Sequence, residues 1–280
     1  MSRILIAGCG DIGTALGREL AAGGHKVYGL RRSVSSLPEI ITPVAADLTS
    51  PETLGALPPV DVLYYMAAAD GRDEAAYERA YVTGVKNILR ALAGQRLERV
   101  FFVSSTSVYG QRSGEWVDEE SETKPARFTG ARVLEGEREA NRAPCLSISV
   151  RFGGIYGPGR RRLIDRVRSG ASCRESPPEF TNRIHRDDCA GILSHLLTLD
   201  SPAERYLGVD CEPAAQCTVM DWLAERLGVP RPRRETAVGG QNQGKRCSNA
   251  RVLKSGYAFR YKSFREGYSS LIDDPNEHDA

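Results

Sequence analysis

The chain is poor in the residues that build metal centres and disulfide frameworks. Its 280 residues include four histidines and seven cysteines, and the cysteines are scattered, odd in number and without a C-x-x-C pair. A metal site needs clustered ligands, and a disulfide framework needs an even set of cysteines in an oxidising compartment. We therefore expect reduced, mostly buried cysteines, with neither a metal site nor a disulfide framework.

A strong charge of one sign and long apolar runs are also missing. Lys and Arg number 38 against 36 Asp and Glu, a formal net charge of +2, which gives no reason to expect a nucleic-acid or membrane partner. No apolar run approaches the length of a membrane span, and a strand that starts at residue 3 leaves no room for a signal peptide. The sequence thus predicts a cytoplasmic protein whose partner is a small molecule.

A glycine motif at the start of the chain lies between a predicted strand and a predicted helix. Residues 3–7 form a short apolar run, and the sequence GCGDIG follows directly. In G-x-G-x-x-G the three glycines allow a tight turn, close approach of a pyrophosphate and close packing of helix on strand. The helix N-terminus adds N–H groups and partial positive charge. We expect the pyrophosphate of a dinucleotide at Gly8, Gly10, Asp11, Ile12 and Gly13; a turn without a ligand is the plainer alternative.

The residues after the second strand (25–30) select the cofactor. An acid there accepts a hydrogen bond from the ribose 2′-hydroxyl of NAD, whereas arginine accommodates the 2′-phosphate of NADP. This chain has Arg31 and Arg32 with no acid nearby in the sequence, and guanidinium groups bind phosphate bidentately. The pair favours NADP, the alternative being two ordinary solvated charges at a strand end.

Strand and helix patterns alternate up to residue 151, and glycine, proline and arginine then crowd residues 153–162. Such alternation predicts a doubly wound parallel sheet of the α/β class, a Rossmann fold. We expect a dinucleotide-binding domain over 1–151 and a smaller substrate-binding lobe over 152–280, from which strands can return to the main sheet.

Several segments in this order resemble the extended short-chain dehydrogenase/reductase superfamily, in particular its NAD-dependent epimerase/dehydratase branch. They are the glycine motif, residues 84–87, residues 151–159 and residues 184–188. The resemblance implies an oxidoreductase or epimerase that acts on a small polar substrate, with a nucleotide sugar as one class. It also implies adenine contacts at Asp47 and Leu48, ribose contacts at Ala67 and Ala68, and a serine-rich strand end at Ser104 and Ser105, the latter matching the family's catalytic hydroxyl.

The chain departs from this family where proton transfer takes place. The family carries Tyr-x-x-x-Lys on the helix after the serine-rich strand, and Thr129 and Val133 stand at those positions here. An aliphatic alcohol cannot replace a phenol of pKa about 10, and valine has no charge. Any activity then rests on Ser105 and on an acid–base group from elsewhere, with Tyr109 and His185 as candidates. A second departure is Tyr81, which stands where the branch usually has asparagine.

Two readings of the function stay open. The first is an NADP-dependent oxidoreductase or epimerase-like enzyme with nonstandard proton transfer. The second is a non-catalytic NADP-binding sensor or interaction protein, which the lost Tyr/Lys pair favours. The arginines of residues 160–168 would suit a nucleotide diphosphate, although such a run is more often a solvated helix face. His185, for its part, has packing as its alternative role.

Overall fold

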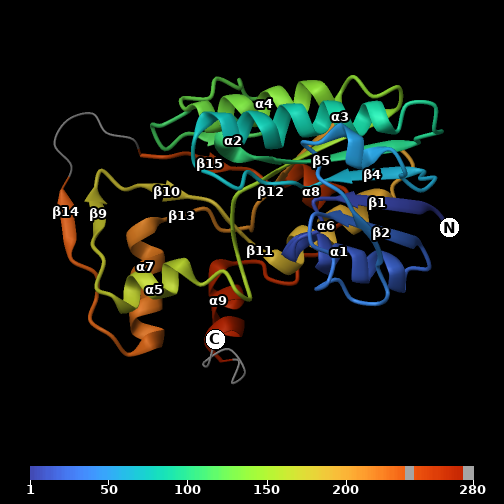
Figure 1. The fold of residues 1–280 in the computed structure, drawn as a ribbon. Coiled ribbons are helices and arrows are strands. Elements are labelled where there is room, and N and C mark those ends of the chain that lie inside the picture. Colours follow the sequence, from blue (N-terminus) through green and yellow to red (C-terminus); the bar gives the residue numbers. More distant parts are fainter. Residues whose placement is uncertain (237–242, 274–280) are drawn as a thin grey trace. The chain divides into compact units, whose positions relative to one another are not determined.

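The computed structural model describes residues 1–236 and 243–273, whose contacts form two compact units (Figure 1). The first unit consists of residues 1–110, 122–151 and 190–206. The second consists of residues 111–121 and 152–189 and the described residues from 207 onward. Each unit is thus built from three segments of the chain, and the single domain boundary at residue 151 stays a prediction.

A seven-stranded parallel sheet forms the centre of the fold, with the strand order β12-β7-β5-β4-β1-β2-β3. The apolar run that precedes the glycine motif is an interior strand between β4 and β2, and Ile4, Leu5 and Ile6 are fully buried there. The predicted doubly wound α/β fold is confirmed. The strands are β1 (Arg3–Ala7), β2 (Lys26–Arg31), β3 (Thr42–Ala45), β4 (Val62–Tyr65), β5 (Arg99–Ser105), β7 (Leu146–Phe152) and β12 (Arg205–Gly208).

Helices cover both faces of this sheet (Figure 1). Consecutive residues of β4 show the two faces, because the Tyr64 hydroxyl donates to the Leu193 carbonyl at 3.1 Å and the Tyr65 hydroxyl to the Ala80 carbonyl. One face carries α1 (Asp11–Ala22) and α6 (Arg186–Leu197). The other carries α2 (Glu74–Glu78), the π-helix η2 (Arg79–Thr83), α3 (Gly84–Ala91) and α4 (Phe128–Ala140). The first unit also contains two 3₁₀ turns, η1 (Pro51–Leu54) and η3 (Thr106–Val108).

The second unit combines short strand pairs with helices. Parallel pairs join β8 (Gly154–Tyr156) to β11 (Arg183–His185), β9 (Cys173–Ser176) to β14 (Arg234–Thr236), and β6 (Trp116–Val117) to β15 (Arg246–Cys247); β10 (Phe180–Thr181) and β13 (Ala214–Ala215) pair antiparallel. The helices are α5 (Arg162–Arg168), α7 (Gln216–Leu227), α8 (Ala250–Lys254) and α9 (Phe264–Ile272). Ile164, Leu223 and Phe264 give α5, α7 and α9 a shared, fully buried core.

One disulfide corrects the expectation of reduced cysteines. Cys173 of β9 and Cys217 of α7 are bonded, with a Cα–Cα separation of 5.4 Å. They are 44 residues apart, so no local spacing in the sequence signals the pair. The other five cysteines, all within the described residues, form no disulfide, and Cys9, Cys189 and Cys247 among them are buried as expected.

Candidate functional site at the carboxyl edge of the sheet

The first glycine of the motif makes the turn from β1 to α1 possible. Gly8 has a φ of +87°, and a Cβ there would lie 2.4 Å from the backbone nitrogen of Ala67, just after β4. A side chain is therefore excluded both by conformation and by space. Gly13 has a packing role, since its Cβ would lie 3.0 Å from the Ile6 side chain. Two loops at the carboxyl edge are thus in direct backbone contact.

Gly10 stands at the open side of the same turn. It is exposed, and among the described residues the only atom near a Cβ built there is the Gly8 carbonyl oxygen, at 4.0 Å. Gly10 is also the N-cap of α1, and intrahelical bonding begins with the Thr14 N–H on the Gly10 carbonyl at 2.8 Å. The amides of Asp11, Ile12 and Gly13 belong to the first turn, where helices offer N–H groups to anions.

The two arginines after β2 differ in their surroundings. Arg31 is half-buried and donates to Ser36 Oγ at 3.0 Å and to the Cys9 carbonyl at 3.5 Å. Arg32 is exposed and pairs with Asp70 at 3.1 Å. No acid lies near the arginines in the sequence, but the loop after β4 brings Asp70 to Arg32 in the fold. Both partners are more than half exposed, and such ion pairs contribute about 0–1 kcal/mol.

The predicted adenine and ribose contacts also lie after strands of this edge. Asp47 is half-buried, and its carboxylate accepts from the Thr49 N–H at 2.8 Å and the Thr49 hydroxyl at 2.7 Å. These bonds lower the pKa of Asp47. Leu48 is buried, and its carbonyl accepts from Asn87 Nδ2 at 3.0 Å. Ala67 is half-buried and Ala68 exposed, so this loop is open where the Gly8 turn meets it.

The two serines at the end of β5 point to different tasks. Ser104 is buried, and its hydroxyl donates to Glu137 Oε1. Ser105 is half-buried, and its hydroxyl accepts from the Ser107 N–H at 3.1 Å as the N-cap of η3. The backbone contact that was the plainer alternative for Ser105 is therefore present. Its partly exposed position leaves the hydroxyl within reach of a ligand.

A buried ion pair lies behind these serines. Arg151, 2% exposed, donates through Nε and Nη2 to the two Glu137 carboxylate oxygens, at 2.8 and 2.7 Å. Its Nη1 donates to the Tyr109 hydroxyl at 2.7 Å, and Tyr109 is itself 2% exposed. This placement gives Tyr109 a packing role against Arg151 and little access to a ligand.

The helix positions that correspond to the missing Tyr/Lys pair offer no replacement. Thr129 is half-buried in the first turn of α4, and Val133 is buried. One phenol does approach this turn: the Tyr77 ring of α2 lies 5.7 Å from that of Phe128. The ring of Tyr81, in η2, lies 5.5 Å from that of Tyr77. Burial raises the pKa of Tyr81 to about 12. No described residue hydrogen-bonds the Tyr81 hydroxyl. The sequence drew attention to Tyr81 because it stands where the family branch usually has asparagine.

His185 lies inside the second unit. It is 1% exposed, with ring centroids 4.1 Å from Tyr261 and 5.4 Å from Tyr156, and its Nδ1 accepts from the Asp187 N–H at 3.2 Å. Asp188 follows in the first turn of α6, fully buried, and accepts from the Tyr257 hydroxyl at 2.8 Å. The surroundings of His185 favour the packing alternative.

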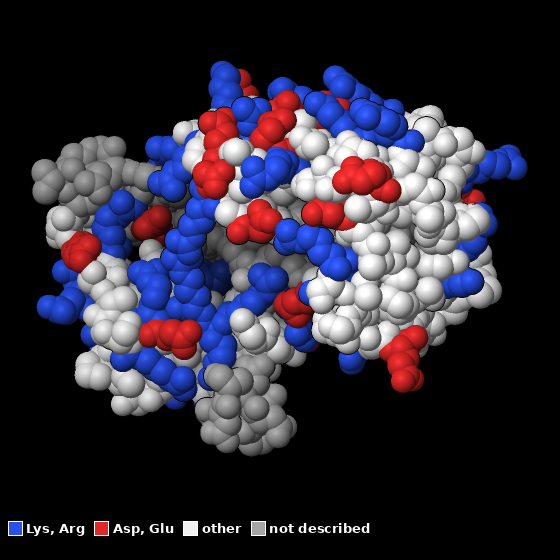
Figure 2. Space-filling model, in the orientation of Figure 1, with Lys and Arg blue, Asp and Glu red and all other residues white. Residues whose placement is uncertain are grey.

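Basic side chains gather on the second unit. Figure 2 shows Lys and Arg crowded over the part of this face that α5, β9 and β14 form. Arg160, Arg162 and Arg168 are exposed, whereas Arg161 and Arg166 are half-buried. The run is thus largely a solvated surface. Within the described residues there is no cluster of three or more potential metal ligands, and no helix has both the length and the apolarity to cross a membrane.

Comparison with known proteins places this geometry among nucleotide-dependent enzymes. The NAD dependent epimerase/dehydratase family matches residues 4–187. Protein YeeZ of Escherichia coli strain K12 is 25% identical over 274 residues, which cover 93% of this chain and 97% of YeeZ. A 2-alkyl-3-oxoalkanoate reductase of Stenotrophomonas maltophilia strain K279a is 25% identical over 258 residues, 82% of this chain and 77% of the reductase.

Solved structures repeat the whole fold. One from Methylobacillus flagellatus, assigned to the NAD-dependent epimerase/dehydratases, is 40% identical with a TM-score of 0.83, covering 97% of this chain and 98% of that one. MoeE5, solved with UDP-glucuronic acid and NAD, is 23% identical with a TM-score of 0.80, covering 97% and 98%. At that identity the second likeness shows the fold.

Proposed function

Because the chain belongs to the NAD dependent epimerase/dehydratase family, we propose that it is an NADP-dependent oxidoreductase or epimerase-like enzyme of a small polar substrate. The observation that carries the proposal is the glycine turn. Gly8 lies against the Ala67 backbone, and the exposed Gly10 opens α1. Space without a side chain, beside a helix N-terminus at the carboxyl edge of a parallel sheet, is where α/β folds bind dinucleotides.

The residues present fit this cofactor. The amides at Gly10 to Gly13 would hold the pyrophosphate, Ala67 and Ala68 the ribose, and the Asp47–Leu48 loop the adenine. When bound, NADP(H) supplies or accepts a hydride. The chain's own residues provide binding, orientation and a route for the proton.

Specificity for NADP rests on Arg31 and Arg32. The Ser36 hydroxyl accepts a hydrogen bond from Arg31 at 3.0 Å. Asp70 competes for Arg32, but an exposed carboxylate contributes only about 0–1 kcal/mol, and a phosphate offers more charge and more acceptor oxygens. We therefore expect the 2′-phosphate to displace Asp70 from Arg32.

A series of variants tests this assignment by calorimetry. Replacing Arg31 and Arg32 together with glutamine should weaken NADPH binding by about 1.5–3 kcal/mol per charged hydrogen bond lost, less for the exposed Arg32, and change NADH little. Asp70→Asn should tighten NADPH slightly. Arg18→Gln, an exposed arginine on α1, is the control. Equal losses for NADH and NADPH in the double variant would overturn the assignment.

Proton transfer is proposed to depend on Ser105 and a second group. Tyr109 and His185 stay candidates, although both are almost completely buried. Tyr81 is more accessible, because it is half-buried; its ring lies 5.5 Å from that of Tyr77, which in turn contacts Phe128 in the first turn of α4. With its pKa raised to about 12, Tyr81 keeps its proton at neutral pH and can donate a hydrogen bond to a substrate oxygen, but it is a weaker acid than an unperturbed phenol, since proton transfer is most efficient from a group whose pKa is near the operating pH.

The relatives supply the substrate classes to test first. MoeE5 was solved with UDP-glucuronic acid, and the Stenotrophomonas relative is a reductase of 2-alkyl-3-oxoalkanoates. A nucleotide sugar or a small ketone therefore heads the test panel. Consumption of NADPH with one of them, lost in Ser105→Ala, would support an enzyme.

The second candidate is a non-catalytic NADP sensor. It is favoured by Thr129 and the buried Val133, which stand at the positions of the family's Tyr/Lys pair. Tight NADPH binding with no turnover on any carbonyl or nucleotide-sugar substrate would select the sensor.

A further inference from the structure

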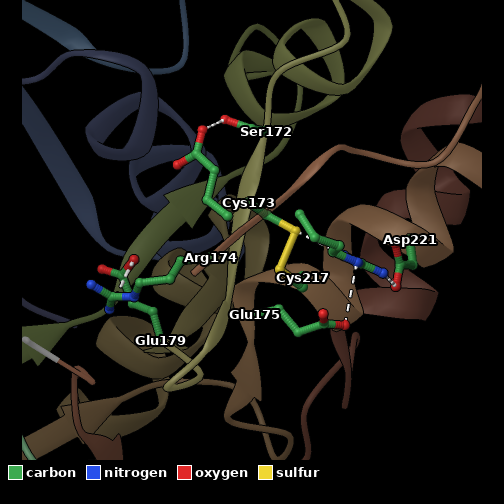
Figure 3. The surroundings of a disulfide bond; sticks show 9 residues. Ser172, Cys173, Arg174, Glu175, Glu179, Cys217 and Asp221 are labelled. Carbon is green, nitrogen blue, oxygen red and sulfur yellow. Dashed lines mark hydrogen bonds and ion pairs between the residues drawn. A yellow bond between two sulfur atoms is a disulfide. The ribbon is translucent and has the colours of Figure 1, made fainter. Parts of the chain in front are cut away.

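A covalent link in the second unit is used by none of the chemistry above. The Cys173–Cys217 disulfide joins β9 to the first turn of α7 (Figure 3). Both sulfurs are buried, Cys173 at 3% exposed and Cys217 at 8%. The same strand β9 pairs with β14, so the bond ties a strand pair to the helix that carries much of this unit's core.

A cation lies against one of the two sulfurs. Arg234 of β14 places Nη1 2.8 Å from Cys173 Sγ. Two carboxylates hold the guanidinium there, Asp221 at 2.5 Å and Glu175 at 3.5 Å. The sulfur of an intact disulfide is a weak, neutral acceptor, whereas a thiolate accepts a charge-assisted hydrogen bond. The contact therefore strengthens when Cys173 becomes a thiolate.

The other sulfur lies in a different field. Cys217 is the second residue of the twelve-residue helix α7, where N–H groups and the helix dipole favour negative charge. Two neighbouring charged groups have other partners, since Arg174 lies 3.6 Å from Glu179 and Glu235 accepts from the Ser172 hydroxyl. Both cysteines are thus stabilised in the reduced state, which makes a disulfide easier to reduce.

We propose that Cys173–Cys217 is a thiol–disulfide exchange site for a dithiol reductant, with Cys217 as the attacked sulfur and Cys173 as the leaving thiolate. A thiolate of the dithiol attacks Cys217 Sγ and forms a mixed disulfide. The Cys173–Cys217 bond breaks, and its electron pair goes to Cys173, where Arg234 holds the thiolate.

The second thiol of the reductant completes the exchange. After losing its proton to water, it attacks the reductant's sulfur in the mixed disulfide and releases Cys217 as a thiolate. Two electrons have then passed from the dithiol, now a disulfide, to the two cysteines. Cleavage removes the covalent link between α7 and the strand pair β9–β14, while Asp221 of α7 and Arg234 of β14 remain paired.

A redox titration of the full chain in dithiothreitol buffers tests the role of Arg234. The fraction of alkylated cysteine is read by peptide mass. Arg234→Gln should move the equilibrium toward the disulfide by about tenfold, which corresponds to about 30 mV, and Arg234→Lys by less because the charge remains. The matched control is Arg226→Gln, which removes an arginine of α7 that pairs with Asp273. It should behave as the unmodified chain. An Arg234→Gln midpoint equal to that of the control would overturn the proposal.

A trapping experiment tests the direction of attack. The oxidised chain is incubated briefly with glutathione, a monothiol without a second thiol for intramolecular resolution of the mixed disulfide, and quenched with acid. The adduct should lie on Cys217, with Cys173 free for alkylation. An adduct on Cys173 would overturn the assignment of the leaving group, and an air-oxidised chain with both thiols free would overturn the site itself. Arg234→Lys keeps the comparison available if Arg234→Gln does not fold.

Discussion

Removal of the Glu137 carboxylate should destabilise the first unit far more than removal of a surface carboxylate. Glu137 receives two hydrogen bonds from Arg151, at 2.8 and 2.7 Å, and one from the Ser104 hydroxyl. Burial alone lowers the pKa of Arg151, but the Glu137 hydrogen bonds and charge more than offset it, so the pKa is raised. In Glu137→Ala the guanidinium stays buried without its counter-charge. Breaking one side of such a pair costs about 3–5 kcal/mol.

The matched comparison is Glu135→Ala, two residues away on the same helix α4. Glu135 pairs with Arg132 at 2.6 Å and is 35% exposed, while Arg132 keeps Glu74 and Glu78 as partners. That loss should stay within about 1 kcal/mol. Glu137→Gln, which keeps the shape and loses the charge, should fall between the two and serves if the alanine variant does not fold.

Urea unfolding followed by far-UV circular dichroism measures the difference. Tryptophan fluorescence is unsuitable, because Trp116 and Trp222 both belong to the second unit. Equal free energies of unfolding for Glu137→Ala and Glu135→Ala would refute the view that the Arg151–Glu137 pair supports the end of β5.

Three further predictions concern the turn, the chemistry and the second unit. Gly8→Ala should abolish NADPH binding in calorimetry, since its Cβ meets the Ala67 backbone. Gly24→Ala, at a φ of +83° with nothing within 4 Å, should retain binding. Retained binding in both variants would contradict a dinucleotide site at the glycine turn. In a turnover assay Ser105→Ala should cost about ten- to a thousandfold and Thr129→Val almost nothing, and the opposite ranking would show that α4 is misaligned. Burial raises the pKa of Asp210 to about 7, so the folded-state pKa lies above the unfolded one. The contribution of protonated Asp210 to the free energy of unfolding is therefore fully present below about pH 4 and is lost as pH rises through 7. The total loss is up to about 4 kcal/mol. Asp210→Asn should flatten that decline in urea unfolding, and an unchanged slope would contradict it.

Local patterns were sufficient to predict much of the first unit. The apolar run over residues 3–7, the glycine motif and the following helical pattern predict β1, the turn and α1, because each depends on neighbours in the sequence. The lack of space for a side chain at Gly8 and Gly13 also agrees with the tight turn and the close helix–strand packing expected of the glycine motif.

Contacts between distant residues could not be predicted in this way. Asp70 reaches Arg32 from 38 positions away, through the arrangement of β2 and β4 rather than through any local pattern. The disulfide joins residues 44 positions apart on a strand and a helix. The partner of Tyr109 is Arg151, 42 positions later. Side chains whose surroundings come from several elements thus need the tertiary structure.

The most direct test of the central claim is the affinity of the unmodified chain for the two cofactors. Calorimetric titrations of NADPH and NADH into one preparation should show binding of both and tighter binding of NADPH, because only NADPH carries the phosphate that Arg31 and Arg32 receive. Equal affinities would contradict the specificity, and binding of neither would contradict the dinucleotide site itself.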